Sequence, residues 1–290
     1  MRRIARYVED RIRSRYPLLY ILLFQRPRAH LRLRNERLVI KGADISSSDH
    51  PSFIFFTVHR CASTYVSRIL RTLAEDAGMV HVDLASYFEL TGVPRSTLFS
   101  DSGSLQKAFK KRGYFYGPLR WLHEIPDMGS YAVLLVLRDP RDVMTSHYYS
   151  TAYSHALINQ GMLARREAAQ QETPDEYVLR ERHWFKGTYE DYCRELLGRP
   201  NVLTLRYEDM LTDFEAWLRQ AARHLALDAN ELLLRRIMDE SDFGVGKENA
   251  FSHKRQVSPG DHRRKLQPAT IEILTAEFRD VLDMLGYPAE

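Results

Sequence analysis

The chain has 290 residues, of which 44% are hydrophobic and 28% charged, with only 14 glycines and 12 prolines. These values exclude collagen-like and low-complexity proteins and are ordinary for a globular protein of one large or two small domains. No stretch approaches the roughly 20 apolar residues of a membrane-spanning helix. Cys61 and Cys193 are the only cysteines, so we expect no disulfide framework and a reducing, cytoplasmic location.

The net charge of +4 is unevenly distributed. Residues 1–41 contain twelve Lys and Arg but three Asp and Glu, a net charge of +9, and the remainder carries −5. Ile4, Val8 and Ile12 recur at helical spacing, which predicts a short amphipathic helix over residues 2–15. We therefore expect a basic helical arm and linker over residues 1–42, followed by a domain over residues 43–290.

The basic arm favours an anionic partner. Residues 2–15 and the apolar stretch Leu18 to Phe24 together predict peripheral contact of residues 2–24 with an anionic membrane surface. An acidic glycan and simple packing of the arm on the body remain alternatives, and no specific nucleic acid partner is expected.

From residue 51 onward, buried strands alternate with amphipathic helices. Residues 53–58, 131–137 and 202–205 are rich in β-branched and aromatic side chains, as in strands covered on both faces. Helices are predicted after each strand: one ends at Gly78, one begins at Pro140 with Asp139 as N-cap, and one follows a capping box at Thr212 and Glu215. A last helix begins at Pro268. This alternation predicts an α/β fold, a central parallel β-sheet flanked by helices.

Two polar loops begin where predicted strands end, at residues 59–65 and 138–146. Ligands of parallel sheets bind at this edge, so both loops should face one crevice. The first loop precedes a helix and carries Arg60, Ser63 and Thr64, which suit an anion. It is not a Walker A loop, because no glycine lies between Phe53 and Ile69 and the loop has no lysine. In the second loop, Arg138 and Ser146 provide a guanidinium and a hydroxyl for a phosphate group.

The two loops, in this order and spacing, resemble those of sulfotransferases that use 3′-phosphoadenosine 5′-phosphosulfate (PAPS). Residues 57–65, Thr-Val-His-Arg-Cys-Ala-Ser-Thr-Tyr, are similar to the family's 5′-phosphosulfate loop, and residues 138–148 to its 3′-phosphate motif. Residues 205–210 are similar to its L-x-Y-E-D segment, and residues 253–261 to a basic C-terminal loop that ends in Gly-Asp. The resemblance implies a P-loop-nucleotide-kinase-like architecture over residues 51–286.

Each segment has an implied role in binding the donor, whose product is 3′,5′-ADP. Arg60 is implied both to bind the donor and to stabilise the leaving group. The other donor-binding residues implied are Cys61, Ala62, Ser63, Thr64, Tyr65, Arg138, Ser146, Tyr207, Lys254, Arg255 and Gln256. His59, Cys61 and Ala62 replace the family's proline, serine and glycine, and Ala62 restricts φ where glycine is usual. Arg255 matches the C-terminal loop, but Gln256 and Val257 stand where the family has lysine and glycine.

The acceptor hydroxyl needs a general base, and the residues do not identify it. Many family members place a histidine or glutamate on the strand before the 3′-phosphate motif, a slot that Tyr116 fills here. A tyrosine with a pKa of about 10 is a poor base. His123 and Glu124 lie close downstream, and His59 is beside the first loop.

The sequence therefore predicts in-line transfer of a sulfuryl group from PAPS to a hydroxyl or amine. The expected acceptor is a carbohydrate, a lipid-linked molecule or another small molecule, and no metal site is expected. The candidates to line its pocket are Tyr114, Phe115, Tyr148, Tyr149, Tyr153 and His155, although aromatic residues of this kind are often plain core. Two alternatives remain: a P-loop nucleotide kinase-like phosphotransferase, and a non-catalytic nucleotide- or membrane-binding module.

Overall fold

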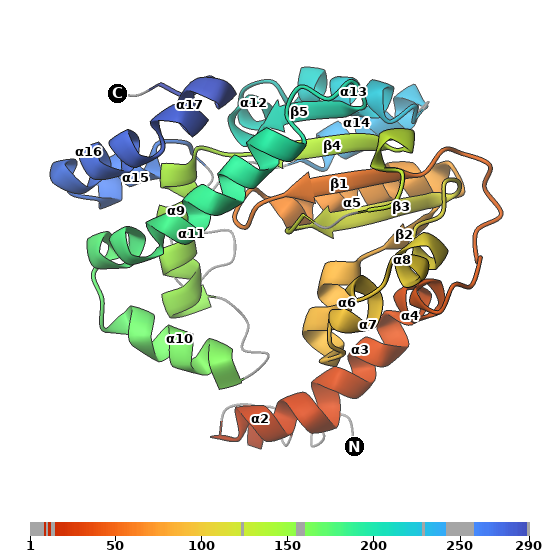
Figure 1. Ribbon diagram of the computed structural model, residues 1–290, viewed down its shortest axis with the longest axis horizontal. Helices are drawn as coiled ribbons and strands as arrows, with labels where there is room; N and C mark the ends of the chain where they lie inside the picture. Colours follow the sequence, from red (N-terminus) through yellow and green to blue (C-terminus); the bar gives the residue numbers. More distant parts are fainter. Residues whose placement is uncertain are drawn as a thin grey trace.

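A five-stranded parallel sheet forms the centre of the protein (Figure 1). The computed structural model describes residues 9, 11–12, 15–122, 125–154, 160–227, 230–241 and 258–288. The strand order is β2-β3-β1-β4-β5, which confirms the predicted fold class. The strands are β1 (Phe53–Thr57), β2 (Val80–Val82), β3 (Tyr114–Leu119), β4 (Ala132–Leu137) and β5 (Val202–Arg206).

Strand β1 is buried along its whole length because helices cover both faces of the sheet. Phe53 and Phe55 pack with α5, α13 and α14, whereas Ile54 and Phe56 pack with α6, α9, α11 and α17. The helices on the first face are α5 (Ser63–Asp76), α12 (Tyr207–Thr212), α13 (Phe214–His224) and α14 (Glu231–Asp239). Those on the second are α6 (Leu84–Thr91), α8 (Ser102–Ala108), α9 (Pro140–Tyr149), α11 (Pro174–Glu195), α16 (Pro268–Glu277) and α17 (Arg279–Leu285).

The sheet has its switch point between β1 and β4. The chain continues from β1 toward the β2 edge, and then from β4 toward the β5 edge. β1 and β4 pair in register from Phe53 opposite Ala132 to Thr57 opposite Val136. Their carboxyl ends therefore deliver the loops after both strands to the same crevice, as a doubly wound sheet requires. Three further helices are α7 (Ser96–Phe99), α10 (Gln160–Gln170) and α15 (Asp261–Lys265). Leu98 of α7 and Ala169 of α10 belong to the same core as Ile54 and Phe56.

The N-terminal region departs from the predicted linker. It forms α2 (Pro17–Tyr20), a π-helical turn at Ile21–Gln25, α3 (Arg26–Arg32) and α4 (Arg34–Ile40). Leu33 and Val39 belong to the main core, and the buried carboxylate of Glu36 accepts a hydrogen bond from the Asp83 amide at 3.0 Å. The linker prediction is wrong for these residues because apolar positions among the arginines pack on the body. Most of the amphipathic helix predicted over residues 2–15 lies outside the described residues.

The helix ends predicted from local sequence signals agree with the structure in some cases and differ in others. Asp139 caps α9 through the Arg141 amide at 2.9 Å, with Pro140 in the first turn, as expected. The predicted capping box is wrong by one residue, since Asp213 caps α13 and Thr212 ends α12. The last predicted helix is two helices, α16 and α17, divided at Phe278.

Candidate active site

The loop between β1 and α5 exposes a helix N-terminus. Arg60 and Ala62 have φ values of 66° and 53°, so the chain makes a tight left-handed turn before α5. Ala62 adopts this conformation although its Cβ makes it less favourable than for glycine. No side chain caps the first turn of α5 at Ala62. The first amides of α5 therefore point outward with the positive end of the helix dipole, which favours an anion.

The side chains of this loop divide between the cavity and the core. Arg60 reaches α9, where its Nε and Nη1 donate to Ser146 and Ser150, both at 3.1 Å. Ser63 accepts a hydrogen bond from Arg120 at 2.9 Å. Cys61 is buried, which raises the pKa of its thiol to about 12. Only the backbone of Cys61 is therefore placed to bind a ligand.

Arg138 lies at the carboxyl end of β4 and is 3% exposed. Its Nη1 donates to the Arg60 carbonyl at 3.3 Å, and its Nη2 lies 3.4 Å from an Asp142 oxygen. The guanidinium stacks on the ring of Tyr207, 4.5 Å from the ring centroid. Its Nε is buried and has no hydrogen-bond partner. A buried cationic donor without an acceptor is costly, and an anionic ligand would complete it.

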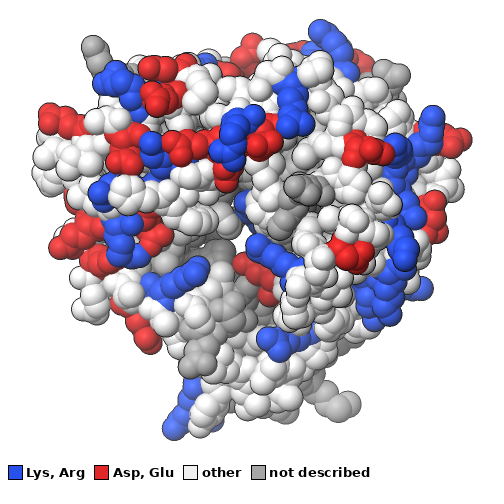
Figure 2. Space-filling model, viewed as in Figure 1, with Lys and Arg blue, Asp and Glu red and all other residues white. Residues whose placement is uncertain are grey.

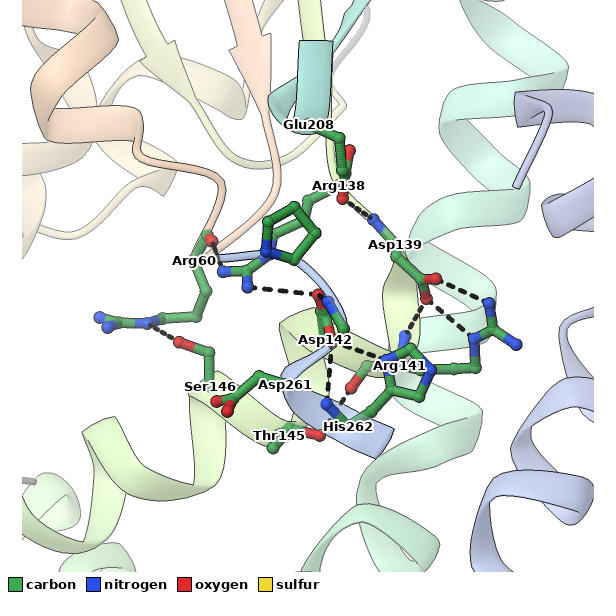
Figure 3. A network of polar contacts seen from close by, with 12 residues as sticks. Arg60, Arg138, Asp139, Arg141, Asp142, Thr145, Ser146, Glu208, Asp261 and His262 are labelled. Atoms are coloured by element: carbon green, nitrogen blue, oxygen red, sulfur yellow. Dashed lines mark hydrogen bonds and ion pairs between the residues drawn. The ribbon is translucent and has the colours of Figure 1, made fainter. Parts of the chain in front are cut away.

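Asp142 connects α9 to the C-terminal Gly-Asp pair (Figure 3). Its fully buried carboxylate accepts from the amides of Gly260 at 2.8 Å and His262 at 2.9 Å, and contacts His262 Nδ1 at 2.6 Å. Burial opposes ionisation, but the hydrogen bonds from His262 and the charge of Arg138 hold the pKa of Asp142 below its usual range. The C-terminal segment is thereby anchored beside Arg138.

A second ion pair stabilises the same turn. Arg141 is fully buried and binds Asp139 through two donors, at 3.0 and 2.7 Å. It also donates to Thr275 at 3.0 Å and to the Pro288 carbonyl at 2.8 Å. Glu208 accepts from the Asp139 amide at 3.1 Å. This network ties the turn after β4 to α12 and the C-terminal helices, so Arg141 and Asp139 hold the motif in place (Figure 3).

The two loops face one cavity of about 1390 Å³. This volume exceeds that of a typical single-ligand pocket and has room for a donor and an acceptor together. The predicted donor-binding residues that line it are Arg60, Ala62, Ser63, Thr64, Tyr65, Arg138, Ser146 and Tyr207. Lys254, Arg255 and Gln256 lie outside the described residues.

Tyr116 is not placed to act as a base. It is fully buried, donates to the Ala108 carbonyl at 2.9 Å and accepts from the Lys110 amide at 2.7 Å. Burial raises its pKa further above the usual value, and the residue does not line the cavity. The structure therefore contradicts Tyr116 as the base. His123 and Glu124 lie outside the described residues.

The aromatic acceptor lining predicted after the second motif is also wrong for the described residues. Tyr148, Tyr149 and Tyr153 pack against one another and do not line the cavity, and His155 lies outside the described part of the chain. Instead His59 lines the cavity, with its ring centroid 6.0 Å from that of His147 and 6.3 Å from that of Trp184.

Two residues that line the cavity were not predicted from the sequence. Arg120 follows β3 directly, at the edge where the first loop begins, and binds Ser63 of that loop. Glu89 on α6 lines the cavity and interacts electrostatically with Arg120 and Arg95. A signal for Arg120 was present, because it is the first charged residue after a strand. The sequence carries no such signal for Glu89, because its segment has the pattern of an ordinary packed helix.

Among the described residues, no group of three or more His, Cys, Asp or Glu side chains is arranged to hold a metal ion. In the same part of the chain, no helix has both the length and the apolar character needed to cross a membrane.

Comparison with known proteins gives the family. Residues 129–282 match the family described as "Sulfotransferase domain". Luciferin sulfotransferase of Photinus pyralis is 25% identical over 142 residues, which are 47% of this chain and 35% of that protein. The match thus spans about a third of the length of this curated relative.

Solved structures with a similar arrangement include mouse sulfotransferase SULT7A1 complexed with PAP, with 15% identity, a TM-score of 0.48 and coverage of 85% of this chain and 88% of that one. Another is retinol dehydratase in a complex with retinol and PAP, with 15% identity and a TM-score of 0.47, covering 86% of this chain and 85% of the other.

Proposed function

The chain belongs to the sulfotransferase domain family, and on that premise we propose that it transfers the sulfuryl group of PAPS to a hydroxyl or amine by in-line displacement. One observation carries the proposal: the buried, unpartnered Nε of Arg138 at the end of β4. Arg138 and Ser146 line the same cavity as the uncapped N-terminus of α5. Two anion sites in one cavity suit a donor with phosphate groups on both sides of its ribose.

These residues fit the donor in a definite order. Arg138 and Ser146 would bind the 3′-phosphate, and the amides of α5 with Ser63 and Thr64 the 5′-phosphosulfate. Tyr207, which stacks on Arg138, would lie near the adenine. The resemblance adds Lys254, Arg255 and Gln256 to the residues that would bind the donor, and Asp142 anchors the Gly-Asp pair that follows them.

The donor supplies an activated sulfuryl group on a nucleotide leaving group. Arg60 carries a permanent positive charge at the turn before α5 and would stabilise negative charge as the leaving group departs. Positioning and charge stabilisation account for most of the catalysis in such transfers of compact anionic groups. Charge stabilisation of this kind requires no metal ion.

We assign the general base to Glu89. Glu89 is exposed and lines the cavity together with Arg120, whose guanidinium binds Ser63 of the first loop. Desolvation by the surrounding wall raises the pKa of Glu89, while Arg120 and Arg95 oppose this rise. A carboxylate with a raised pKa is a stronger base than an ordinary one. His59, which lines the cavity, and His123 and Glu124 remain candidates from the sequence.

Calorimetric titration with 3′,5′-ADP and, separately, with ATP and Mg²⁺ tests the function. We expect 3′,5′-ADP to bind tightly and ATP weakly, because Arg138 and Ser146 recognise a 3′-phosphate that ATP lacks. Binding of ATP alone would favour the nucleotide kinase alternative and contradict the proposal. Binding of neither nucleotide would contradict the proposal and favour a non-catalytic membrane-binding module.

Replacement of Arg138 by Gln, or of Ser146 by Ala, should weaken 3′,5′-ADP binding selectively. A hydrogen bond to a charged group contributes about 1.5–3 kcal/mol, so we expect a loss of roughly 10- to 100-fold for Arg138→Gln. Adenosine 5′-monophosphate, which lacks the 3′-phosphate, is the matched ligand and should lose much less. Equal losses for both ligands, or a large drop in the unfolding midpoint, would show that these residues support the fold instead.

The acceptor we propose is a carbohydrate or a lipid-linked molecule close to an anionic membrane surface. Leu18, Leu19, Leu22 and Leu23 project from α2 and the following turn and are 42–56% exposed. They lie beside Arg26, which lines the cavity, within a strongly basic segment. An apolar helical face flanked by arginines suits the interface of an anionic bilayer.

Flotation with vesicles of anionic lipid tests this contact. We expect binding at low salt that is lost at high salt, because screening shortens the Debye length from about 30 Å at 0.01 M to 3 Å at 1 M. Leu22→Ser with Leu23→Ser should weaken binding. Leu232→Ser is the control, because Leu232 is 72% exposed but lies on α14, outside the basic segment. Absence of flotation at low salt would contradict the membrane proposal.

A further inference from the structure

Two buried arginine–aspartate pairs lie where β4 passes into α9, and they differ in geometry (Figure 3). Arg141 closes on Asp139 through two donors, at 3.0 and 2.7 Å. Arg138 is joined to Asp142 by one contact, from Nη2 to Oδ2, at 3.4 Å. A guanidinium and a carboxylate commonly form the two-pronged arrangement seen in the first pair. The open geometry of the second pair therefore needs a physical cause.

His262 supplies two of the hydrogen bonds that Asp142 accepts. Its backbone amide and its Nδ1 both contact Oδ1, at 2.9 and 2.6 Å. The Gly260 amide binds Oδ2, the oxygen that also faces Arg138, at 2.8 Å. A carboxylate has about four lone-pair sites, two on each oxygen. Because His262 fills both sites of Oδ1, no acceptor remains there for a second prong from Arg138.

The ionisation of Asp142 sets the direction of the imidazole contact. Burial opposes ionisation, but the hydrogen bond from the His262 side chain and the charge of Arg138 hold the pKa of Asp142 below its usual range. The ionised carboxylate can only accept, so His262 Nδ1 carries a hydrogen and donates it. Among the described residues, no group forms a hydrogen bond with the buried Nε2 of the same ring. The hydrogen bonding of the imidazole is thus directed at Asp142.

Burial makes these contacts decisive for Arg138. Figure 2 shows several Lys and Arg side chains beside Asp or Glu on the surface, where water and salt screen both charges. Arg138 is only 3% exposed, so its protein partners determine how much of its charge a ligand meets. Within the described part of the chain its Nε has no partner, and its contacts with the Arg60 carbonyl and Asp142 are long, 3.3 and 3.4 Å. A close pair with Asp142 would neutralise the guanidinium and occupy its donors.

We propose that His262 is a positioning residue for the donor: by occupying Oδ1 of Asp142, it prevents a two-pronged pair and leaves Arg138 available to the 3′-phosphate. The inference rests on the proposed function, because it takes Arg138 to bind this phosphate. His262 lies on α15 and is not among the described residues that line the cavity. It therefore acts through Asp142 and does not touch the nucleotide. The pair of Arg141 and Asp139 shows the geometry that Arg138 would adopt without it.

The test compares the affinities of the full chain for 3′,5′-ADP and for adenosine 5′-monophosphate. His262→Leu removes the imidazole donor at similar volume. We expect this variant to bind 3′,5′-ADP roughly tenfold more weakly, because Asp142 would then compete with the phosphate for Arg138. Adenosine 5′-monophosphate has no 3′-phosphate, so its affinity should change much less. His262→Asn keeps an amide donor near the position of Nδ1 and should restore most of the lost affinity.

The asparagine variant separates positioning from a structural role. Asparagine is smaller than histidine and leaves a cavity at a buried site. A merely structural role therefore predicts that His262→Asn binds 3′,5′-ADP no better than His262→Leu. Thermal unfolding checks that each variant is folded. If His262→Leu is not folded, His262→Gln takes its place, because the longer side chain carries its amide away from the position of Nδ1.

His224→Leu is the matched control. The Nε2 of His224 contacts the Val133 carbonyl at 3.0 Å on α13, and the residue is not among the described residues that line the cavity. Its replacement also removes an imidazole hydrogen bond from the protein interior, but at a site that does not contact Asp142. The affinities for both nucleotides should therefore stay unchanged.

The outcomes distinguish this inference from the proposed function. If the unmodified chain does not bind 3′,5′-ADP, the proposed function fails. If it binds, and His262→Leu keeps its affinity or loses both nucleotides equally, only the role of His262 is overturned. A His262→Asn variant that binds as weakly as His262→Leu would overturn it as well. Selective loss of 3′,5′-ADP binding that asparagine restores would support it.

Discussion

Replacement of Glu89 by glutamine should lower the rate of sulfuryl transfer by roughly 10²- to 10⁴-fold, the usual contribution of a general base. The amide keeps the shape and hydrogen-bonding capacity of the side chain but accepts no proton. Binding of 3′,5′-ADP should be unchanged, because Glu89 lies on α6, on the acceptor side of the cavity. Release of 3′,5′-ADP from the donor, with water or an added sugar as nucleophile, provides the measurement.

The pH profile distinguishes a base from a structural carboxylate. Glu89 must be ionised to act, so the rate should fall as the pH drops through its pKa, which desolvation raises above the usual value for glutamate. In Glu89→Gln this acid limb should disappear. Glu181→Gln is the matched control, since Glu181 lines the same cavity but is paired with Arg180. A Glu89→Gln profile that keeps its acid limb and its rate would exclude Glu89.

Replacement of Arg60 by alanine should lower the turnover number by roughly 10²- to 10³-fold, as for the loss of one electrostatic donor to a developing charge. Its effect on donor affinity should be smaller, because the charge acts mainly on the leaving group. The same 3′,5′-ADP release assay, with donor and acceptor saturating, measures the effect.

Arg60→Lys is the informative companion variant. Lysine supplies the positive charge without the planar fork, so it should restore part of the lost turnover. The hydrogen bonds from Arg60 to Ser146 and Ser150 are both 3.1 Å, and Ser150→Ala removes one of them while keeping the charge. Turnover in Arg60→Ala equal to that of the unmodified chain would remove Arg60 from catalysis.

Much of the fold and the donor site could be predicted from local patterns. The apolar runs at residues 53–58 and 131–137 are strands because both faces of a parallel sheet are covered, and β1 and β4 form there. Asp139 and Pro140 mark the start of α9. Both signals can be predicted from the sequence, because an N-cap side chain and the fixed φ of proline act within a single helical turn. Arg60, Arg138 and Ser146 line one cavity because they follow β1 and β4, whose carboxyl ends lie side by side in the sheet.

The sequence by itself indicated three of the sheet's five strands, the start of α9 and the donor motifs, because each depends on residues close together along the chain. Only the tertiary structure decided which distant side chains meet. It buries Tyr116, brings Glu89 and Arg120 into the lining of one cavity, and anchors the C-terminal Gly-Asp segment on Asp142 across more than a hundred residues. It also converts the expected N-terminal linker into helices that supply Arg26 to the cavity wall. These contacts form because helices pack on both faces of the sheet and bring together segments that are far apart in the sequence. A local sequence pattern therefore cannot predict them.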